Sequence, residues 1–202
     1  IDGWTISGAI DLQTVGESSI GISDYKTTGV WAVMNEKKEW ELQLNIYAWL
    51  VERVKKSPVD SLEIVAIIRD WSAREAAYKE DYPQAPIVTI DIPLWPMIDR
   101  TSFIEKRLQS HAEAYFESES GGNLPECTPE DMWEKPEKFA VMKEGGKRAK
   151  SVHNTRDEAE SVLPAKGYFI EHRKGERTRC QSFCQVSDYC EQYQQYLAAQ
   201  PK

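Results

Sequence analysis

The hydrophobic pattern of the first part of the chain alternates between strand-like and helix-like segments. Residues 39–56 place Trp40, Leu44, Tyr47 and Val51 near one face of an amphipathic helix, and residues 61–71 form a β-branched run typical of a central strand. The pattern predicts strands over 4–13, 18–26, 61–71 and 87–92, helices over 39–56 and 99–117, and a hairpin turn at Gly16. This order predicts an α/β fold, with a mixed central sheet and flanking helices.

The pattern changes after Gly121-Gly122. It then predicts a small β-β-α-β insert: a hairpin over 139–152 that turns at Gly145-Gly146, a helix over 154–163 with Asn154 or Thr155 as its N-cap, and a strand over 167–172. We therefore expect two regions, a core over 1–122 and a C-terminal region over 123–202, with the insert at 138–179.

Composition indicates a folded protein and limits how it could bind nucleic acid. Of the 202 residues, 41% are hydrophobic and 10% are aromatic, which is enough for a buried core. No apolar run approaches the ~20 residues of a membrane-spanning helix, so we expect no membrane partner. The 25 Lys and Arg against 33 Asp and Glu give a net charge of −8. This balance argues against a protein that coats duplex DNA by bulk charge.

The start of the chain carries no recognisable targeting signal. It opens with Ile1 rather than Met, and no charged segment followed by an apolar one comes after it. With only four cysteines, we expect an intracellular, cytoplasmic setting. We also expect the chain to be a fragment of a longer protein.

Two carboxylates and a lysine converge on the predicted N-terminal hairpin. Asp24 and Lys26 share one face of the second strand, and the turn brings Asp11 of the first strand close to the level of 22–24. Two hard oxygen ligands suit Mg²⁺, and a neighbouring lysine can orient or deprotonate a water or stabilise charge on a phosphate. The arrangement therefore indicates phosphodiester hydrolysis, although Asp-x-Lys alone also fits a solvated ion pair.

Gln43 and Tyr47 lie one helical turn apart on the helix that follows the hairpin. Their amide and phenol can hydrogen-bond a phosphate or a base near the metal. The alternative is that Tyr47 belongs to the core and Gln43 lies at its rim.

Three motifs in order resemble the PD-(D/E)XK nuclease superfamily: GAID at 8–11, ISDYKTT at 22–28 and QLNIYAWL at 43–50. The closest branch is the RecB-type nucleases, and the whole chain is similar to phage-encoded members. The resemblance covers about residues 3–95. It implies a restriction-endonuclease-like core.

The resemblance also implies roles for individual residues. Mg or Mn would bind at Asp11, Asp24 and the backbone carbonyl of Tyr25, and Lys26, Gln43 and Tyr47 would complete the catalytic set. The family usually carries a His or Glu on a helix before the first strand. Because nothing precedes Ile1, we expect this core to lack that helix, and so to bind metal poorly or to be inactive.

The four cysteines are Cys127 and a C-x3-C-x5-C group at Cys180, Cys184 and Cys190. Four thiolates can hold a [4Fe-4S] cluster or Zn²⁺, and such a group would tie the chain end to the segment after the second long helix. The resemblance implies a [4Fe-4S] cluster. However, the family's usual spacing is C-x2-C-x5-C, with the distant cysteine before the nuclease motifs. Zinc, disulfides and four unrelated buried thiols therefore stay open.

The insert at 138–179 is basic, with 11 Lys and Arg against 6 Asp and Glu, a net charge of 11 − 6 = +5. Its hairpin tip can contact a phosphate backbone or can simply be a solvated turn. Trp31 and Trp40 flank the loop after the Asp-Tyr-Lys motif and can stack on bases or pack on the core. The candidate DNA-binding residues at the tip are Lys143, Lys147, Arg148 and Lys150.

The leading hypothesis is a metal-dependent DNA nuclease, and an exonuclease in particular, that acts in phage or bacterial DNA recombination, repair or replication. Its partners would be DNA, single-stranded or with free ends, and a helicase or recombination protein. One alternative is a non-catalytic DNA-binding module on the same fold. Another is a scaffold closed by a metal clip, with protein partners only.

Overall fold

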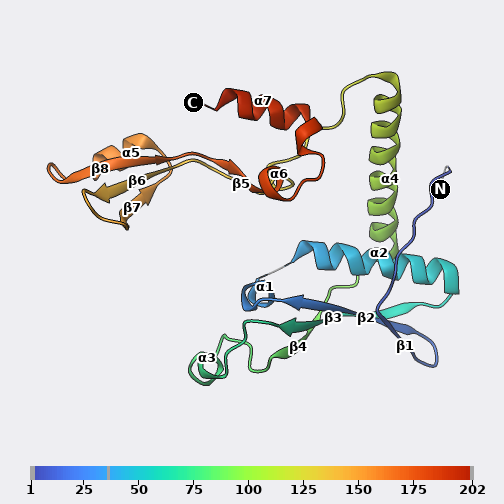
Figure 1. Cartoon of the computed structure of the whole chain (residues 1–202). Coiled ribbons are helices and arrows are strands. Elements are labelled where there is room, and N and C mark those ends of the chain that lie inside the picture. Colours follow the sequence, from blue (N-terminus) through green and yellow to red (C-terminus); the bar gives the residue numbers. More distant parts are fainter. Residues whose placement is uncertain (1–2, 36, 201–202) are drawn as a thin grey trace. The chain divides into compact units, whose positions relative to one another are not determined.

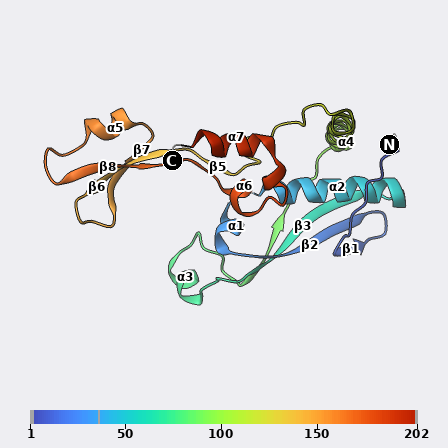
Figure 2. The ribbon, with the colours of Figure 1, turned by 45° about the horizontal axis from the view of Figure 1, so that its top comes forward.

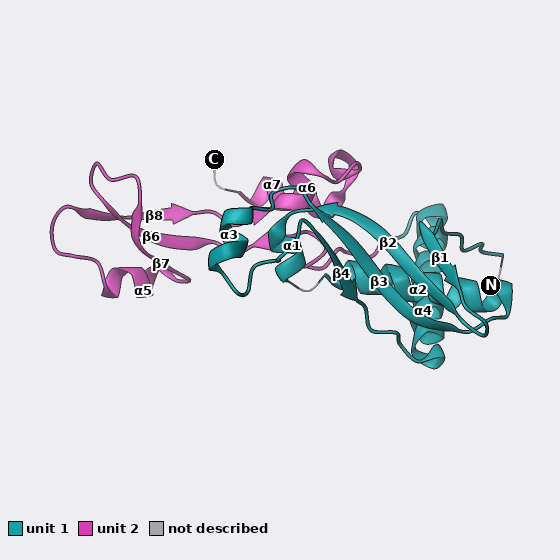
Figure 3. Ribbon diagram, turned by 90° about the horizontal axis from the view of Figure 1, so that it is seen from below, with its two compact units in different colours: residues 1–122 teal, residues 123–202 magenta. Residues whose placement is uncertain are grey.

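The chain divides into two compact units, Ile1–Gly122 and Asn123–Lys202 (Figure 3). The structure is a computed structural model that describes residues 3–35 and 37–200, so Ile1 lies outside the described residues. No helix in these ranges is both long enough and apolar enough to cross a membrane.

A mixed four-stranded sheet forms the framework of the first unit. Its strands are β1 (Leu12–Val15), β2 (Ile20–Thr28), β3 (Val59–Ile68) and β4 (Ile87–Asp91), in the order β1-β2-β3-β4. The central pair β2 and β3 is parallel, whereas β1 and β4 pair antiparallel at the two edges. The mixed central sheet predicted from the sequence is confirmed.

Helix α2 (Lys38–Lys55) connects the two parallel strands and covers one face of the sheet (Figures 1 and 2). Leu44, Ala48 and Val51 of this helix are buried against the apolar side chains of the central strands. Trp40 and Tyr47 pack at the margin of the same core. The sequence predicted this face of the helix correctly, because an 18-residue helix repeats its apolar period several times. The buried core residues of the sheet are Ile20, Ile22, Val59, Leu62, Ile64 and Ala66.

The predicted strand over 4–13 is wrong in its extent, since only Leu12–Val15 forms a strand. In a continued ladder, the N–H of Tyr25 would bond to the backbone of the partner strand. Instead, the Asp11 carboxylate accepts that N–H, with 2.9 Å between Tyr25 N and Asp11 Oδ2. A side chain thus takes the place of the backbone partner, and the hairpin pairing ends there.

Helix α4 (Met97–Ser120) is fixed to α2 by buried polar contacts. Arg100 Nη2 lies 3.0 Å from Glu52 Oε2, and the other oxygen of Glu52 accepts the N–H of Val59 at 3.0 Å. The indole N–H of Trp49 donates to the Thr101 hydroxyl at 3.1 Å. Because the guanidinium is 4% exposed, its charge depends on Glu52 for compensation.

Two short helices complete the first unit: α1 (Val30–Met34) follows β2 and α3 (Ala73–Tyr78) follows β3. Neither was predicted from the sequence. The Asp70 carboxylate accepts the first N–H of α1, with 2.7 Å between Val30 N and Asp70 Oδ1, and the Ser72 hydroxyl caps α3 by accepting the N–H of Glu75.

The second unit contains the predicted β-β-α-β insert, which is confirmed. Strands β6 (Lys138–Lys143), β7 (Ala149–His153) and β8 (Tyr168–Arg173) form an antiparallel sheet in the order β7-β6-β8. Helix α5 (Arg156–Ser161) begins after Thr155, whose side chain accepts the N–H of Glu158. The other elements are β5 (Glu134–Lys135), β9 (Glu176–Arg177), α6 (Thr178–Ser182), the 3-10 helix η1 (Ser187–Tyr189) and α7 (Glu191–Ala199).

Candidate functional site

The hairpin register places Asp11 beside Asp24. Leu12 pairs with Ser23, so the next residues outward along the two strands are Asp11 and Asp24. Asp24 is buried, with 3% of its surface exposed, whereas Asp11 is exposed. The bond from Tyr25 N holds the exposed Asp11 carboxylate at the backbone of the residue that follows Asp24.

Asp24, Lys26, Gln43 and Tyr47 form one connected polar network. Lys26 Nζ lies 2.6 Å from Asp24 Oδ2 and donates to Gln43 Oε1 at 2.9 Å. Gln43 Nε2 donates to Asp24 Oδ1 at 3.3 Å and to the Tyr47 hydroxyl at 2.9 Å. The structure therefore brings together on one patch of the first unit all the side chains that the sequence assigned to this site.

A glycine lets the N-terminal segment pass close to the tyrosine of this network. A Cβ on Gly8 would lie 2.7 Å from Cε1 of the Tyr47 ring, which is closer than real Cβ contacts allow. Gly8 is the first residue of the GAID motif, and Asp11 is the last. The motif thus provides both the carboxylate and the space that the tyrosine needs.

The donor set of the site is suited to a hard divalent cation. Asp24 Oδ2 is buried and makes no hydrogen bond to the described residues, and its contact is the ion pair with Lys26. Mg²⁺ is commonly held by one or two carboxylates, with waters and phosphate oxygens as the other ligands. Asp11 and Asp24 match that requirement. Consistent with so small a ligand set, no group of three or more His, Cys, Asp or Glu that could hold a metal occurs in the described part of the chain.

A family model described as the PD-(D/E)XK nuclease superfamily matches residues 1–191. The chain belongs to this superfamily. Membership implies nuclease activity with DNA as substrate, and nucleases of this superfamily typically use Mg or Mn. Searches of curated proteins and of solved structures give no match. The fold agrees with the family, because a mixed sheet with flanking helices is its restriction-endonuclease-like core.

The motifs did not reveal a pocket at the end of β2. The pocket has a volume of about 530 Å³ and is lined by Val30, Trp31 and Met34 of α1 and by residues 79–82. Trp31 is 67% exposed, whereas Trp40 is half-buried at the core. The signals available in the sequence were the apolar run at 30–34, shortly after the Asp-Tyr-Lys motif, and the Ser72-x-x-Glu75 capping pattern before residues 79–82.

The four cysteines are all free thiols that lie near one another in the second unit. Burial raises the pKa of Cys127 and of Cys180, and the neighbouring cysteines raise both pKa values further. The described residues contain no group of three or more His, Cys, Asp or Glu that is already arranged as a metal site. The segments that carry the thiols are held by hydrogen bonds in which the thiols take no part.

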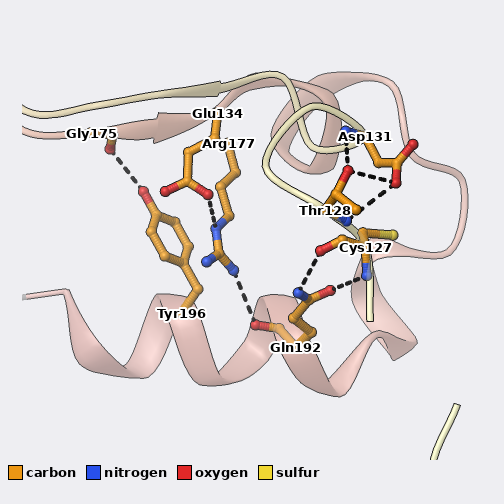
Figure 4. A network of polar contacts seen from close by, with 8 residues as sticks. All are labelled: Cys127, Thr128, Asp131, Glu134, Gly175, Arg177, Gln192 and Tyr196. Carbon is orange, nitrogen blue, oxygen red and sulfur yellow. Dashed lines mark hydrogen bonds and ion pairs between the residues drawn. The ribbon is translucent and has the colours of Figure 1, made fainter. Parts of the chain in front are cut away.

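Figure 4 shows one set of these bonds. The Gln192 side chain on α7 accepts the N–H of Cys127 at 3.0 Å and donates to its carbonyl at 3.0 Å. Arg177 forms an ion pair with Glu134 at 3.3 Å, and its guanidinium lies 4.4 Å from the centre of the Tyr196 ring. Helix α7 is thereby fastened to the segments around Cys127 and β9 by polar contacts.

The basic hairpin tip is exposed to solvent. Lys143 ends β6, and Lys147 and Arg148 lie in the turn before β7. Lys150, on β7, has its ammonium 5.2 Å from the centre of the Tyr168 ring. The four candidate DNA-binding residues therefore lie on one hairpin, and all four are exposed.

Proposed function

We propose that this chain is a metal-dependent deoxyribonuclease whose active site consists of Asp11, Asp24, Lys26, Gln43 and Tyr47. The observation that carries the proposal is the buried Asp24 carboxylate, which is shared by an ammonium and an amide, while the Asp11 carboxylate is bonded to the backbone of the next residue, Tyr25. A buried carboxylate is costly unless it is paired, and the Lys26 ammonium supplies that pairing at 2.6 Å.

Each residue has a role that follows from its contacts. Asp11, Asp24 and the Tyr25 carbonyl would hold Mg²⁺ or Mn²⁺, which would supply Lewis acidity and an activated water at the phosphate. Lys26 would stabilise the negative charge that develops on the phosphate or take the proton of the attacking water. The Tyr47 hydroxyl accepts its bond from Gln43, so its own proton is available to a phosphate oxygen.

The test is cleavage of linear DNA in Mg²⁺ or Mn²⁺ by the wild type and by Asp24→Asn. The control variant is Asp60→Asn, which changes an exposed aspartate at the start of β3 whose oxygens accept from Ser19 and Ser61. We expect Asp24→Asn to lower the cleavage rate at least about 100-fold and Asp60→Asn to leave it unchanged. Equal rates in all three proteins would refute the proposal.

We further propose that cleavage proceeds from DNA ends, as in the RecB-type branch that the three motifs resemble. A linear substrate should then be degraded, while a covalently closed circle of the same sequence stays intact. Nicks in the circle would instead identify an endonuclease.

For the C-terminal region we propose that the four thiols take up a [4Fe-4S] cluster or Zn²⁺. The support is that all four are free and lie near one another, and that Gln192 holds the backbone of Cys127 in place. Because burial raises the pKa of Cys127 and Cys180, loading must release protons and should weaken as the pH falls. Metal analysis of the purified protein and absorbance near ~400 nm separate the two groups. A protein that contains neither iron nor zinc, even after anaerobic reconstitution, would refute this proposal.

A further inference from the structure

The pocket beside α1, called here the Trp31 pocket, adjoins the strand that carries the proposed catalytic residues. Its lining residues Val30, Trp31 and Met34 begin two residues after the end of β2. Lys26 and Trp31 are five residues apart, so their Cα atoms are separated by at most about 18 Å. A nucleic-acid strand whose phosphate lies at Lys26 can therefore place a neighbouring nucleotide at this pocket.

Both walls of the pocket are tied to the segment that follows β3. Asp70 Oδ1 accepts the N–H of Val30 at 2.7 Å, and a Cβ on Gly29 would lie 3.1 Å from that carboxylate. On the other wall, the Tyr82 hydroxyl accepts the N–H of Ser72 at 2.9 Å. The pocket is thus preformed on the first unit, which lowers the cost of ordering a ligand there.

The chemistry of the lining fits a planar ligand with apolar faces and polar edges. Trp31 presents two thirds of its surface to solvent although the Lys37 ammonium lies 4.4 Å from its ring centre. At the rim, Glu80 and Asp81 can accept hydrogen bonds from ring or amino N–H groups, and Lys79 can donate one.

We propose that the Trp31 pocket binds an unpaired nucleobase by stacking on the indole, so that the substrate is single-stranded where it passes α1. The inference rests on the proposed nuclease function, and it names the strand form that the same site takes. A base within a duplex is stacked and paired on all sides and cannot enter the pocket, whereas every unpaired base has a free face.

The test measures binding of the full chain to fluorescein-labelled oligothymidine by anisotropy, in EDTA so that no hydrolysis occurs. We expect Trp31→Ala to weaken binding about tenfold, because stacking of one base contributes ~1–3 kcal/mol. Trp31→Phe should retain most of the affinity. The matched control is Phe116→Ala on α4, an aromatic residue that is 69% exposed and should be neutral. A strand of the same length without bases should bind equally to wild type and Trp31→Ala.

Several outcomes would overturn the inference. The first is that Trp31→Ala binds oligothymidine with wild-type affinity. The second is that Trp31→Ala loses as much affinity for the strand without bases as for oligothymidine. The third is an equal loss of affinity for the duplex made by annealing oligoadenine to oligothymidine. The cleavage assay separates this failure from failure of the proposed function. If the wild type cleaves DNA and Trp31→Ala binds as the wild type does, the pocket assignment alone is wrong. If the wild type neither binds nor cleaves DNA, both are wrong.

Discussion

Gln43 connects the charged and uncharged groups of the proposed active site. Its carbonyl accepts from Lys26, and its amide N–H₂ donates to Asp24 and to Tyr47. It is therefore a positioning residue for the lysine, since it fixes the ammonium against the carboxylate without carrying charge itself. This role depends on the amide having both an acceptor and two donors, which no apolar residue of the same size provides.

Replacing this amide should slow cleavage without unfolding the protein. We expect Gln43→Leu to lower kcat about 100-fold, because small displacements of catalytic groups have effects of that size. Tyr47→Phe should cost less, since Gln43 keeps its bonds to Lys26 and Asp24. Single-turnover cleavage rates measure the effect, and circular dichroism checks the fold. Wild-type rates in folded Gln43→Leu would show that the amide has no part in positioning.

The residues that the sequence identified at this site are those whose spacing is set by a regular element. Asp24 and Lys26 share a strand face, and Gln43 and Tyr47 share a helix face, so periodicity alone groups each pair. The contribution of Gly8 could not be predicted, because it depends on a close approach between segments far apart in the chain. The role of Asp70 at the start of α1 was hidden for the same reason.

At the scale of elements, long periodic segments were predictable and short ones were not. The apolar face of α2 repeats over 18 residues, whereas α1 spans 5 residues and α3 spans 6, too few for a helical period to be recognised. The predicted strand over 4–13 was too long, because the alternation of hydrophobic and polar residues continues beyond the point where the pairing ends. At that point the Asp11 side chain accepts the backbone N–H of Tyr25. Such competition between side chain and backbone leaves no trace in the hydrophobic pattern.

The attachment of α4 to α2 should depend more on Glu52 than on Arg100. Glu52→Ala leaves the guanidinium buried without a counter-charge and should lower the free energy of unfolding by about 3–5 kcal/mol. Arg100→Met should cost less, because the Glu52 carboxylate keeps its bond from Val59 N and is the more exposed partner. Urea denaturation gives both values. The control is Glu75→Ala, which breaks an exposed pair with Lys79 and should change little. Equal losses for the two buried partners would contradict this asymmetry.

At the scale of the whole molecule, charge is distributed unevenly along the chain. The insert at 138–179 carries +5, so the remaining residues carry 14 − 27 = −13. A total of −8 therefore excludes only binding by bulk charge, and it leaves room for local contacts at the basic hairpin. Part of the negative charge is the pair of carboxylates that a divalent cation would offset.

If the hairpin contacts DNA, neutralising its tip should change the salt dependence of binding. We expect the double variant Lys147→Ala, Arg148→Ala to bind a single strand more weakly. The logarithm of the binding constant falls as the logarithm of the salt concentration rises. The slope of this line should become less steep by about 0.7 for each phosphate that the hairpin no longer neutralises. The control within the same unit is Lys135→Ala, whose ammonium is already paired with Glu176 at 3.6 Å. An unchanged slope in the double variant would indicate that these basic residues form a solvated turn and do not contact DNA.

The most direct measurement of the central claim is the rate at which Lys26→Met cleaves linear DNA in Mg²⁺. This variant keeps an unbranched side chain that is one atom shorter and removes the ammonium that contacts Asp24 and Gln43. We expect a loss of about 10²–10⁴-fold relative to the wild type, whereas Lys38→Met, which changes an exposed lysine on α2, should cleave as the wild type does. Cleavage by Lys26→Met at the wild-type rate would contradict the central claim.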